Sequence, residues 1–257
     1  MPAPLVLIAP AMAVPSVFYR PLVAAFEAKG WDAQALANTG FERGEPIASR
    51  SNDWSYADEM QRIAVSVAKA RAESPARPVI LMGHSLGSQI SVGHQLHHPP
   101  ADGFVAIGAS VPYFRSYPKG GLHVLGLGVT VPVVARIRGF VPKPMFGGPG
   151  PRTLMREWAR FVRSGRPPFA VPHAVAEPTL VINLQGDTYS VAKANALFIE
   201  KFLDPARTTT WLYRKDAVPE GGNTHHVLWG KTPGPVVDQI VEWWAQQQRG
   251  SSRHLDQ

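Results

Sequence analysis

The segment PVILMGHSLGS, residues 78–88, decides the fold that this chain is expected to adopt. An apolar run typical of a β-strand (79–82) ends at Gly-His-Ser-Leu-Gly, and a segment that can form a helix follows at once. This is the context of a nucleophile elbow, a strained, tight turn in which Gly83 and Gly87 leave room for the backbone. It predicts that the hydroxyl of Ser85 stands above the edge of a sheet as a nucleophile. The alternative is a strand–turn–helix joint in which the serine is accidental.

Length and composition favour one sizeable domain. The chain has 257 residues, 45% of them apolar, which fits one α/β domain with an insertion. It has no cysteine, which excludes disulfides and thiolate metal sites and agrees with the cytoplasmic location that we expect. The N-terminal apolar run is a poor signal peptide, because its first basic residue is Arg20 and prolines interrupt it. No uninterrupted apolar run approaches the length of about 18 residues that would indicate a membrane span, so none is expected.

The positive charge of the chain is concentrated in one segment. The formal net charge is +7, but residues 112–177 hold ten basic and two acidic residues, a net charge of +8. Two hypotheses follow: a substrate with an anionic part, or a solvated, arginine-rich surface. The ten basic residues are Arg115, Lys119, Arg136, Arg138, Lys143, Arg152, Arg156, Arg160, Arg163 and Arg166, and the two acidic ones are Glu157 and Glu177.

Strands and helices are expected to alternate along most of the chain. Apolar residues at helical spacing and short β-branched or apolar runs carry this prediction, and the polar stretch 38–54 is expected to be a loop. Alternation implies right-handed crossovers and a mostly parallel sheet with helices on both faces, an α/β fold. Strands are predicted at 5–9, 31–37, 79–82, 104–107, 179–184 and 208–213, and helices at 16–29, 56–73, 86–97, 193–202 and 235–248.

Residues 112–177 interrupt this alternation. They are rich in proline and glycine and too long for a simple connection, which is typical of a lid or binding element. We therefore expect one core domain, formed by residues 1–111 and 178–257, with 112–177 inserted as a cap over the active site. One helix is predicted in the cap, at 152–164, with apolar residues along one face and arginines on the others.

A reactive serine needs a base that takes its proton and an acid that orients the base. In a fold of this type these partners follow in the order Ser, Asp or Glu, His, each on a loop after a strand. Asp187 fits because it follows the strand at 179–184, whereas no carboxylate follows the strand before it. Asp204, Asp216 and Glu220 are weaker alternatives.

Two adjacent histidines, His225 and His226, are candidates for the base, because they lie between the last strand and the last helix. His225 follows a small residue, whereas His226 has the better spacing to Pro233 at the start of the final helix. We favour His226 and expect the other histidine to line the pocket. His94 and His98 lie four residues apart on a helix, but no carboxylate joins them, so a metal site is not expected.

The oxyanion formed during acyl transfer requires two preorganised N–H donors. The amide of Leu86, directly after the nucleophile, is expected to be one of them. The other is expected from the turn after the first strand, where Met12 is the best candidate because Pro10 has no N–H.

At these residues the chain resembles the α/β-hydrolase superfamily, from its first strand to its last helix. More narrowly, it is similar to a bacterial group of predicted hydrolases with a Pro-Ala-Met-Gly turn. The resemblance implies an α/β-hydrolase fold, a Ser-Asp-His triad and no cofactor, but no particular substrate. Ala13 and Ser88 depart from it, because glycine is common at both positions. The motifs that carry the narrower resemblance are APAMAVP (9–15), FYRP (18–21), GHSLGSQ (83–89) and EWAR (157–160).

Together these features predict a serine hydrolase that cleaves a carboxylic ester of a small molecule through a covalent acyl-enzyme. Ser85 would attack, His226 or His225 would transfer the proton, and Asp187 would orient the imidazole. Amide, thioester or carbon–carbon bond hydrolysis with the same triad is the alternative, as is a non-catalytic binding protein of the same fold. Nucleic acid is not an expected partner, because no binding motif accompanies the isoelectric point of about 9.9. The oligomeric state is left open.

Overall fold

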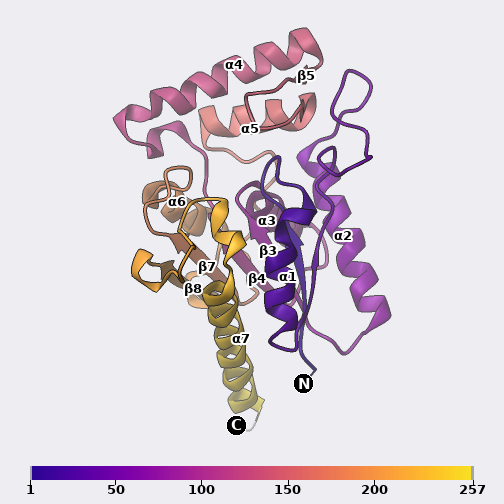
Figure 1. The fold of residues 1–257 in the computed structure, drawn as a ribbon, viewed down its shortest axis with the longest axis vertical. Helices are drawn as coiled ribbons and strands as arrows, with labels where there is room; N and C mark the ends of the chain where they lie inside the picture. Colours follow the sequence, from indigo (N-terminus) through magenta and orange to yellow (C-terminus); the bar gives the residue numbers. More distant parts are fainter. Residues whose placement is uncertain (1, 256–257) are drawn as a thin grey trace.

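Six parallel strands form the central sheet, in the order β2-β1-β3-β4-β7-β8 (Figure 1). The structure, a computed structural model, describes residues 2–255. The α/β class predicted from the alternating pattern is confirmed. The strands are β1 (Leu5–Ala9), β2 (Asp32–Ala35), β3 (Val79–His84), β4 (Gly103–Ile107), β7 (Thr179–Leu184) and β8 (Thr208–Tyr213).

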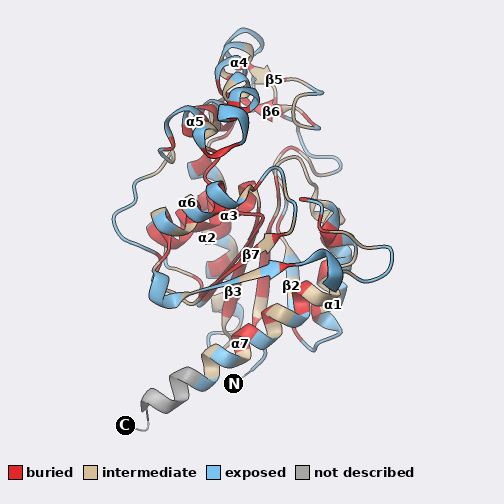
Figure 2. Cartoon of the chain, turned by 90° about the vertical axis from the view of Figure 1, so that its left-hand side faces the viewer, coloured by how far each residue is buried: buried red, intermediate tan, exposed pale blue. Residues whose placement is uncertain are grey.

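Helices cover both faces of the sheet because successive side chains of each strand point to opposite sides. In β1, Leu7 and Ala9 belong to the core shared with α2 and α3, whereas Val6 and Ile8 belong to the core shared with α1 and α7. Helix α6 lies with α3 on the first of these faces. Figure 2 shows the buried strands between the two layers. These helices are α1 (Arg20–Glu27), α2 (Tyr56–Glu73), α3 (Leu86–His97), α6 (Ala192–Phe202) and α7 (Gly234–Leu255).

Several connections contain short 3-10 helices. The helix expected at 16–29 is divided into a 3-10 turn, Ser16–Tyr19, and α1, which begins just before Pro21. The other 3-10 turns are Phe114–Ser116, Lys119–Gly121, Pro205–Arg207, Lys215–Ala217 and Leu228–Lys231.

The insertion, residues 112–177, lies over the carboxyl ends of the strands (Figure 1). It contains α4 (Leu122–Arg138), the short strands β5 (Phe140–Val141) and β6 (Gly150–Pro151), and α5 (Arg152–Ser164). The prediction of a single helix in this segment was therefore wrong, because α4 was missed. Its sequence is apolar on all sides and contains glycines and a proline, so it lacks both helical periodicity and helix propensity.

Packing against α5 explains why α4 forms despite this sequence. A Cβ atom at Gly128 would lie 2.8 Å from Cγ1 of Val162, so the absence of a side chain lets the two helices approach closely. Val124, Val131 and Ala135 are also buried on this side of α4. Tertiary contacts thus override the weak local preference.

By length and composition, the stretch Lys119–Arg138 would be able to cross a membrane, the one such helix in the described part of the chain. In this structure it packs on α5, and most of its residues are not buried. Its remaining surface is unusually apolar for a helix exposed to solvent.

Two carboxylates fasten the insertion to the core. Asp53, in the loop before α2, accepts hydrogen bonds from the backbone N (2.8 Å) and Oγ1 (2.6 Å) of Thr153 in the first turn of α5. In return, Glu157 of α5 accepts one from the backbone N of Tyr56, the first residue of α2, at 2.9 Å. Each helix therefore has an N-terminal N–H satisfied by the segment of the other, which fixes α5 above the sheet.

The elbow glycine at position 87 should tolerate no side chain, because a Cβ there would overlap the backbone carbonyl oxygens of Ala9 and Pro10. We expect Gly87→Ala to lower the free energy of unfolding by about 2 kcal/mol. The control is Gly126→Ala, on the exposed side of α4 with nothing within 4 Å of the added atom. It should raise that free energy by about 0.5 kcal/mol through helix propensity. Denaturant unfolding of both variants measures the difference; equal effects would contradict it.

Candidate active site

Ser85 lies in a strained turn between β3 and α3. Its backbone has φ 54° and ψ −114°, a conformation that L-residues rarely adopt. A Cβ at Gly83 would lie 2.6 Å from the backbone N of Ser88, so the turn also needs glycine before the serine. The Ser88 hydroxyl donates to the Gly83 carbonyl at 2.6 Å, which stabilises the turn from below. This geometry places the Ser85 hydroxyl at the end of the strand, beside the positive end of α3.

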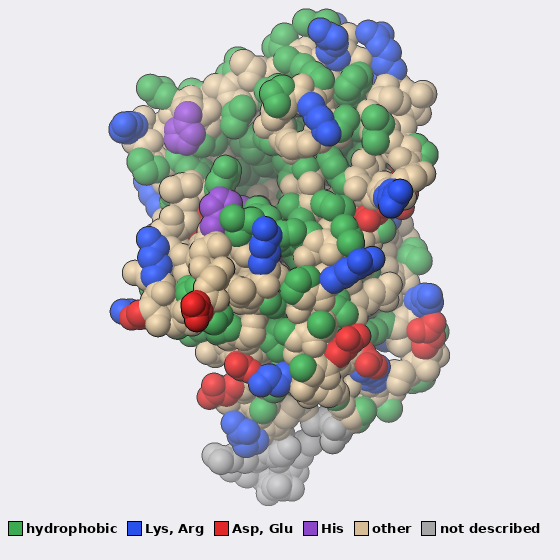
Figure 3. All heavy atoms as spheres, in the orientation of Figure 1, with side chains coloured by type: hydrophobic (Ala, Val, Ile, Leu, Met, Phe, Trp, Pro, Cys, Tyr) green, Lys and Arg blue, Asp and Glu red, His purple; other side chains and the backbone are tan. Residues whose placement is uncertain are grey.

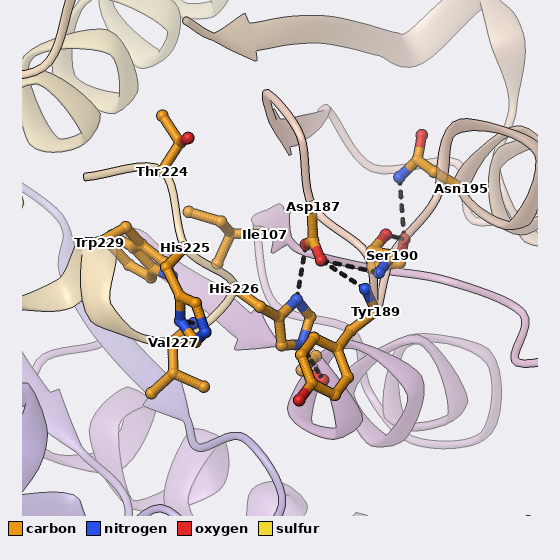
Figure 4. Close-up of polar contacts among 12 residues, drawn as sticks. Ile107, Asp187, Tyr189, Ser190, Asn195, Thr224, His225, His226, Val227 and Trp229 are labelled. Atoms are coloured by element: carbon orange, nitrogen blue, oxygen red, sulfur yellow. Dashed lines mark hydrogen bonds and ion pairs between the residues drawn. The ribbon is translucent and has the colours of Figure 1, made fainter. Parts of the chain in front are cut away.

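His226 lies between Ser85 and Asp187. Its Nε2 is 2.8 Å from the Ser85 Oγ. Its Nδ1 is 2.6 Å from the Asp187 Oδ2, a contact drawn in Figure 4. An ionised Asp187 can only accept, so Nδ1 carries the imidazole proton and Nε2 is free to accept from the serine hydroxyl. The structure therefore brings together three of the residues singled out in the sequence, in the order nucleophile, base and acid.

The backbone of the following turn holds Asp187 in place. The N–H groups of Tyr189 and Ser190 donate to Oδ1 at 2.8 and 3.0 Å, leaving Oδ2 for the imidazole. Burial raises the pKa of Asp187, but the hydrogen bond and charge of His226 and the two backbone N–H groups outweigh it and lower that pKa below its usual value. The carboxylate is thus ionised at neutral pH, as an orienting acid must be.

The adjacent histidine has a different environment. His225 is exposed, and its Nδ1 accepts a hydrogen bond from the backbone N of Val227 at 3.2 Å. Figure 4 shows its ring directed away from Asp187, although the residue borders the active-site cavity. His226 instead packs on Gly108, where a Cβ would lie 3.0 Å from its Cε1. The glycine after β4 thus leaves room for the imidazole.

Met12 and Leu86 line the same cavity as Ser85. Among the described residues, neither of their backbone amides donates a hydrogen bond, so both are available to an oxyanion. Asn38 holds the turn that carries Met12, because its side-chain Nδ2 donates to the carbonyls of Ala11 and Val14, each at 2.8 Å.

A buried chain of hydrogen bonds connects this turn to the base. The Nε2 of His84 is 2.7 Å from the carbonyl oxygen of His226, and its Nδ1 is 2.8 Å from the hydroxyl of Tyr19. That hydroxyl in turn accepts from the backbone N of Ala11 at 2.9 Å. Because a carbonyl only accepts, Nε2 carries the proton and Nδ1 accepts from Tyr19. The contact of Trp229 Nε1 with the same Nε2, at 3.3 Å, is then packing rather than a hydrogen bond.

Burial keeps His84 neutral in this arrangement. Burial, together with the nearby His226, lowers the pKa of His84 to about 3. The imidazole therefore has a structural role: its hydrogen bonds connect Tyr19, which holds the oxyanion turn at Ala11, to the backbone carbonyl of His226. It does not transfer protons at neutral pH.

A cavity of about 720 Å³ opens above Ser85, between the core and the insertion. In Figure 3 it is the hollow beneath the upper part of the molecule. No carboxylate, lysine or arginine lines it in the described part of the chain, so the ten basic residues of the insertion lie outside its wall. Its apolar lining consists of Ala11, Met12, Leu86, Pro112, Val124, Leu127, Met145, Phe146, Trp158 and Val227, with the aromatic rings of Tyr117 and Tyr189.

Residues 1–135 match the model of the Hydrolase_4 family, described as serine aminopeptidase, S33. The chain belongs to this family. It is accordingly a serine hydrolase, and the order strand, elbow, helix in the matched part is the one that carries Ser85. No curated protein sequence matches the chain.

Solved structures similar to this hydrolase share its fold across nearly the whole chain. A soluble variant of monoglyceride lipase from Saccharomyces cerevisiae is 15% identical, with a TM-score of 0.66, covering 93% of this chain and 85% of that one. Monoacylglycerol lipase from Paleococcus ferrophilus is 14% identical, with a TM-score of 0.63 and coverage of 94% and 96%. The pyrethroid hydrolase PytH is 17% identical, with a TM-score of 0.61 and coverage of 95% and 98%. These similarities confirm the α/β-hydrolase fold.

A second cavity, of about 310 Å³, adjoins the first and shares Met12, Leu86 and Phe146 with it. Two carboxylates, Glu45 and Glu59, line this side cavity. Burial raises the pKa of Glu59, although a hydrogen bond from Thr39 and the charge of Arg62 act in the opposite direction.

Sequence reasoning missed the residues that support the site rather than form it. Tyr19 and Asn38 act through contacts between segments far apart in the chain, which no local pattern reveals. The position of Tyr19 within the FYRP motif was the one available signal. Tyr189, whose ring lies 5.1 Å from that of His226, directly follows the predicted acid loop and was equally overlooked.

The neutral state of His84 should appear in the pH dependence of stability. Its pKa is about 3 in the folded protein and about 6.5 when unfolded, so the unfolded chain binds the extra proton between these values. The contribution of neutral His84 to the free energy of unfolding is fully present above pH 6.5. It is lost as the pH falls toward 3, by about 1.4 kcal/mol per pH unit. His84→Asn should remove this slope from denaturant unfolding curves between pH 6 and 4 (roughly one proton).

The control for this measurement is Ser88→Ala, which breaks a buried hydrogen bond in the same elbow without removing a titrating group. It should lower the free energy of unfolding at every pH and keep the slope of the unmodified protein. An unchanged slope in His84→Asn would show that His84 is not buried in its neutral form.

Proposed function

We propose that this protein hydrolyses carboxylic esters of hydrophobic acids, without a cofactor, through an acyl-enzyme on Ser85. The observation that carries the proposal is the unbroken contact from Asp187 through His226 to the Ser85 hydroxyl, at the floor of an uncharged, largely apolar cavity. The substrate class is a small molecule whose acyl part fits between the core and the insertion.

Acylation follows from this geometry. As the Ser85 oxygen attacks the ester carbonyl, Nε2 of His226 takes the hydroxyl proton, and Asp187 stabilises the imidazolium that forms. The carbonyl oxygen becomes an oxyanion, which the amides of Met12 and Leu86 bind. When the tetrahedral intermediate collapses, the imidazolium gives its proton to the departing alcohol. Deacylation repeats these steps with water as the nucleophile, releasing the acid and restoring the serine.

The cavity supports an apolar acyl chain more than a charged one. Burying a carboxylate or ammonium there would leave it without a partner of opposite charge, at a cost of several kcal/mol. An alkyl or aryl chain instead gains about 0.8 kcal/mol for each CH₂ removed from water. The anionic substrate considered from the charge of the insertion therefore has no supporting contact in this cavity.

The lipase and hydrolase titles of the similar structures agree with ester cleavage. The Pro-Ala-Met turn supports the narrower relation to the bacterial group named above. Ala13 has a positive φ of 59°, the conformation that glycine adopts most easily, which accounts for the glycine that is common there.

Aminopeptidase activity is the second candidate, favoured by the side cavity. An ammonium group at the N-terminus of a peptide needs a carboxylate partner, and Glu45 and Glu59 line the side cavity next to the cavity of Ser85, although Arg62 already lies 3.8 Å from Glu59 there. Comparing amino-acid p-nitroanilides with p-nitrophenyl esters of matched size separates the two functions. Faster cleavage of the anilides, lost in Glu59→Gln, would establish the aminopeptidase; esterase activity should be insensitive to that change.

Labelling with a fluorophosphonate probe tests the nucleophile and its base. The unmodified protein should be labelled, and Ser85→Ala should not. His226→Ala should slow labelling and ester hydrolysis by at least about 10³-fold, because the serine loses its base. His225→Ala, the matched control on the neighbouring residue, should retain activity within about threefold. Labelling of Ser85→Ala, or a larger loss in His225→Ala than in His226→Ala, would overturn the assignment.

A series of p-nitrophenyl esters of increasing chain length tests the acyl cavity. Leu127 lines the cavity, so Leu127→Trp should shift the preferred acyl chain to a shorter one by filling part of it. Val129→Trp, on the outer side of the same helix, is the control and should leave the preference unchanged. Hydrolysis rates across the series give the result, and an identical shift in both variants would place the acyl chain elsewhere.

A further inference from the structure

The outer side of α4 exposes a row of large apolar side chains to solvent, interrupted at Gly126. Leu122, Val129, Val133 and Ile137 are 71%, 52%, 54% and 65% exposed. At about 100° per residue they fall within about 80° of one another around the helix, opposite the side that packs on α5. Isolated exposed apolar residues are ordinary, but a row along four turns of one helix indicates a contact surface.

Arginines of α5 flank this row. Arg156, Arg160 and Arg163 are exposed and line a shallow groove with Pro132 of α4, so basic side chains lie beside the helix that carries the apolar row. Arg163 also donates a hydrogen bond to the carbonyl of Gly128, which joins the two helices at this point. Arg136, in the last turn of α4, adds a further exposed charge.

Carboxylates are scarce on this face. The sequence has no aspartate or glutamate from 112 to 156, and Figure 3 shows hydrophobic and basic side chains over the upper part of the molecule. Glu157 borders the groove, but one of its oxygens is engaged by the backbone of Tyr56. Arg152 is the one arginine of α5 that forms an ion pair in the described part of the chain, with Asp53.

We propose that this α4–α5 face, defined by Leu122, Val129, Val133 and Ile137 with Arg136, Arg156, Arg160 and Arg163, docks on the surface of an anionic phospholipid bilayer. Apolar side chains that enter the acyl boundary beside arginines that pair with phosphates are the combination by which interfacial helices bind such surfaces. A second copy of this chain fits the face less well, because two segments of net charge +8 would be brought together.

Docking in this orientation places the active site close to the lipid. The next residue after Leu122, His123, lines the active-site cavity, as does Leu127 one turn later. One side of α4 thus borders the cavity while the neighbouring side contacts the bilayer. A hydrophobic ester would then pass along the helix from the lipid to Ser85 with little exposure to water. The proposal of docking is argued from the exposed residues of α4 and α5 alone. Only the transfer of substrate from the lipid to Ser85 depends on the proposed function.

Co-sedimentation with vesicles tests the docking. The full chain should bind vesicles of phosphatidylcholine containing phosphatidylserine about tenfold or more tightly than vesicles of phosphatidylcholine alone. Ser85→Ala should bind equally well, so a failure of the esterase assignment and a failure of docking are distinguishable. Binding of the unmodified protein to neither vesicle would overturn the proposal.

Two double variants separate the apolar and the charged contributions. Val129→Ser with Val133→Ser, and Arg156→Gln with Arg160→Gln, should each weaken binding to the anionic vesicles by about tenfold or more. Both should keep the hydrolysis rate of a short, soluble ester, which shows that the fold is intact. The control is Val65→Ser with Lys69→Gln on α2, where Val65 is 59% exposed on the core, and its binding should be unchanged.

Equal weakening in the control, or no weakening in either α4–α5 variant, would overturn the assignment of this face. Analytical ultracentrifugation tests whether the face instead binds a second copy of the chain. A concentration-dependent dimer that Val129→Ser with Val133→Ser abolishes would also overturn the proposal, because it would assign the face to a second copy of the chain.

Discussion

The left-handed backbone of Ser85 is the constraint on which the rest of the site depends. A residue with positive φ at the end of a buried strand is costly, and it persists only because its surroundings leave no alternative. Gly87 lies against the carbonyls of Ala9 and Pro10, so the elbow and the oxyanion turn are in direct backbone contact. Any relaxation of the serine would therefore displace the turn that carries Met12. The nucleophile and the oxyanion donors are positioned by the same packing.

His84 extends this coupling to the base. Its ring lies between the hydroxyl of Tyr19 and the carbonyl of His226, so the residue before the nucleophile also sets the position of the residue that activates it. Complete burial, rather than the hydrogen bonds themselves, keeps the ring neutral. Three loops that meet at the carboxyl edge of the sheet are thereby held in one geometry. This follows a general rule that active sites store local strain and compensate for it through well-packed neighbours.

The insertion has two surfaces with opposite characters. Its inner surface closes an uncharged cavity over Ser85, whereas its outer surface holds the excess positive charge and the exposed apolar row. Asp53 and Glu157 fix its position on the core, because Asp53 binds the N-terminus of α5 and Glu157 binds the N-terminus of α2. The same helix, α4, contributes to both surfaces. Gly128, unfavourable in an isolated helix, allows the close approach of α4 to α5.

Local sequence was sufficient to predict the α/β fold and the position of the nucleophile. A strand, an elbow and a helix are encoded by neighbouring residues, and the apolar periodicity of the other segments shows how they alternate. Asp187 was also accessible, because an acid loop directly follows a strong strand. Two adjacent histidines could not be separated in this way, since the choice depends on which ring fits over Gly108.

Only the tertiary structure decided three features: helix α4, the hydrogen bonds of His84 to Tyr19 and His226, and the absence of charged groups from the described cavity wall. Each results from contacts between residues distant in the chain, whose energies no local pattern contains.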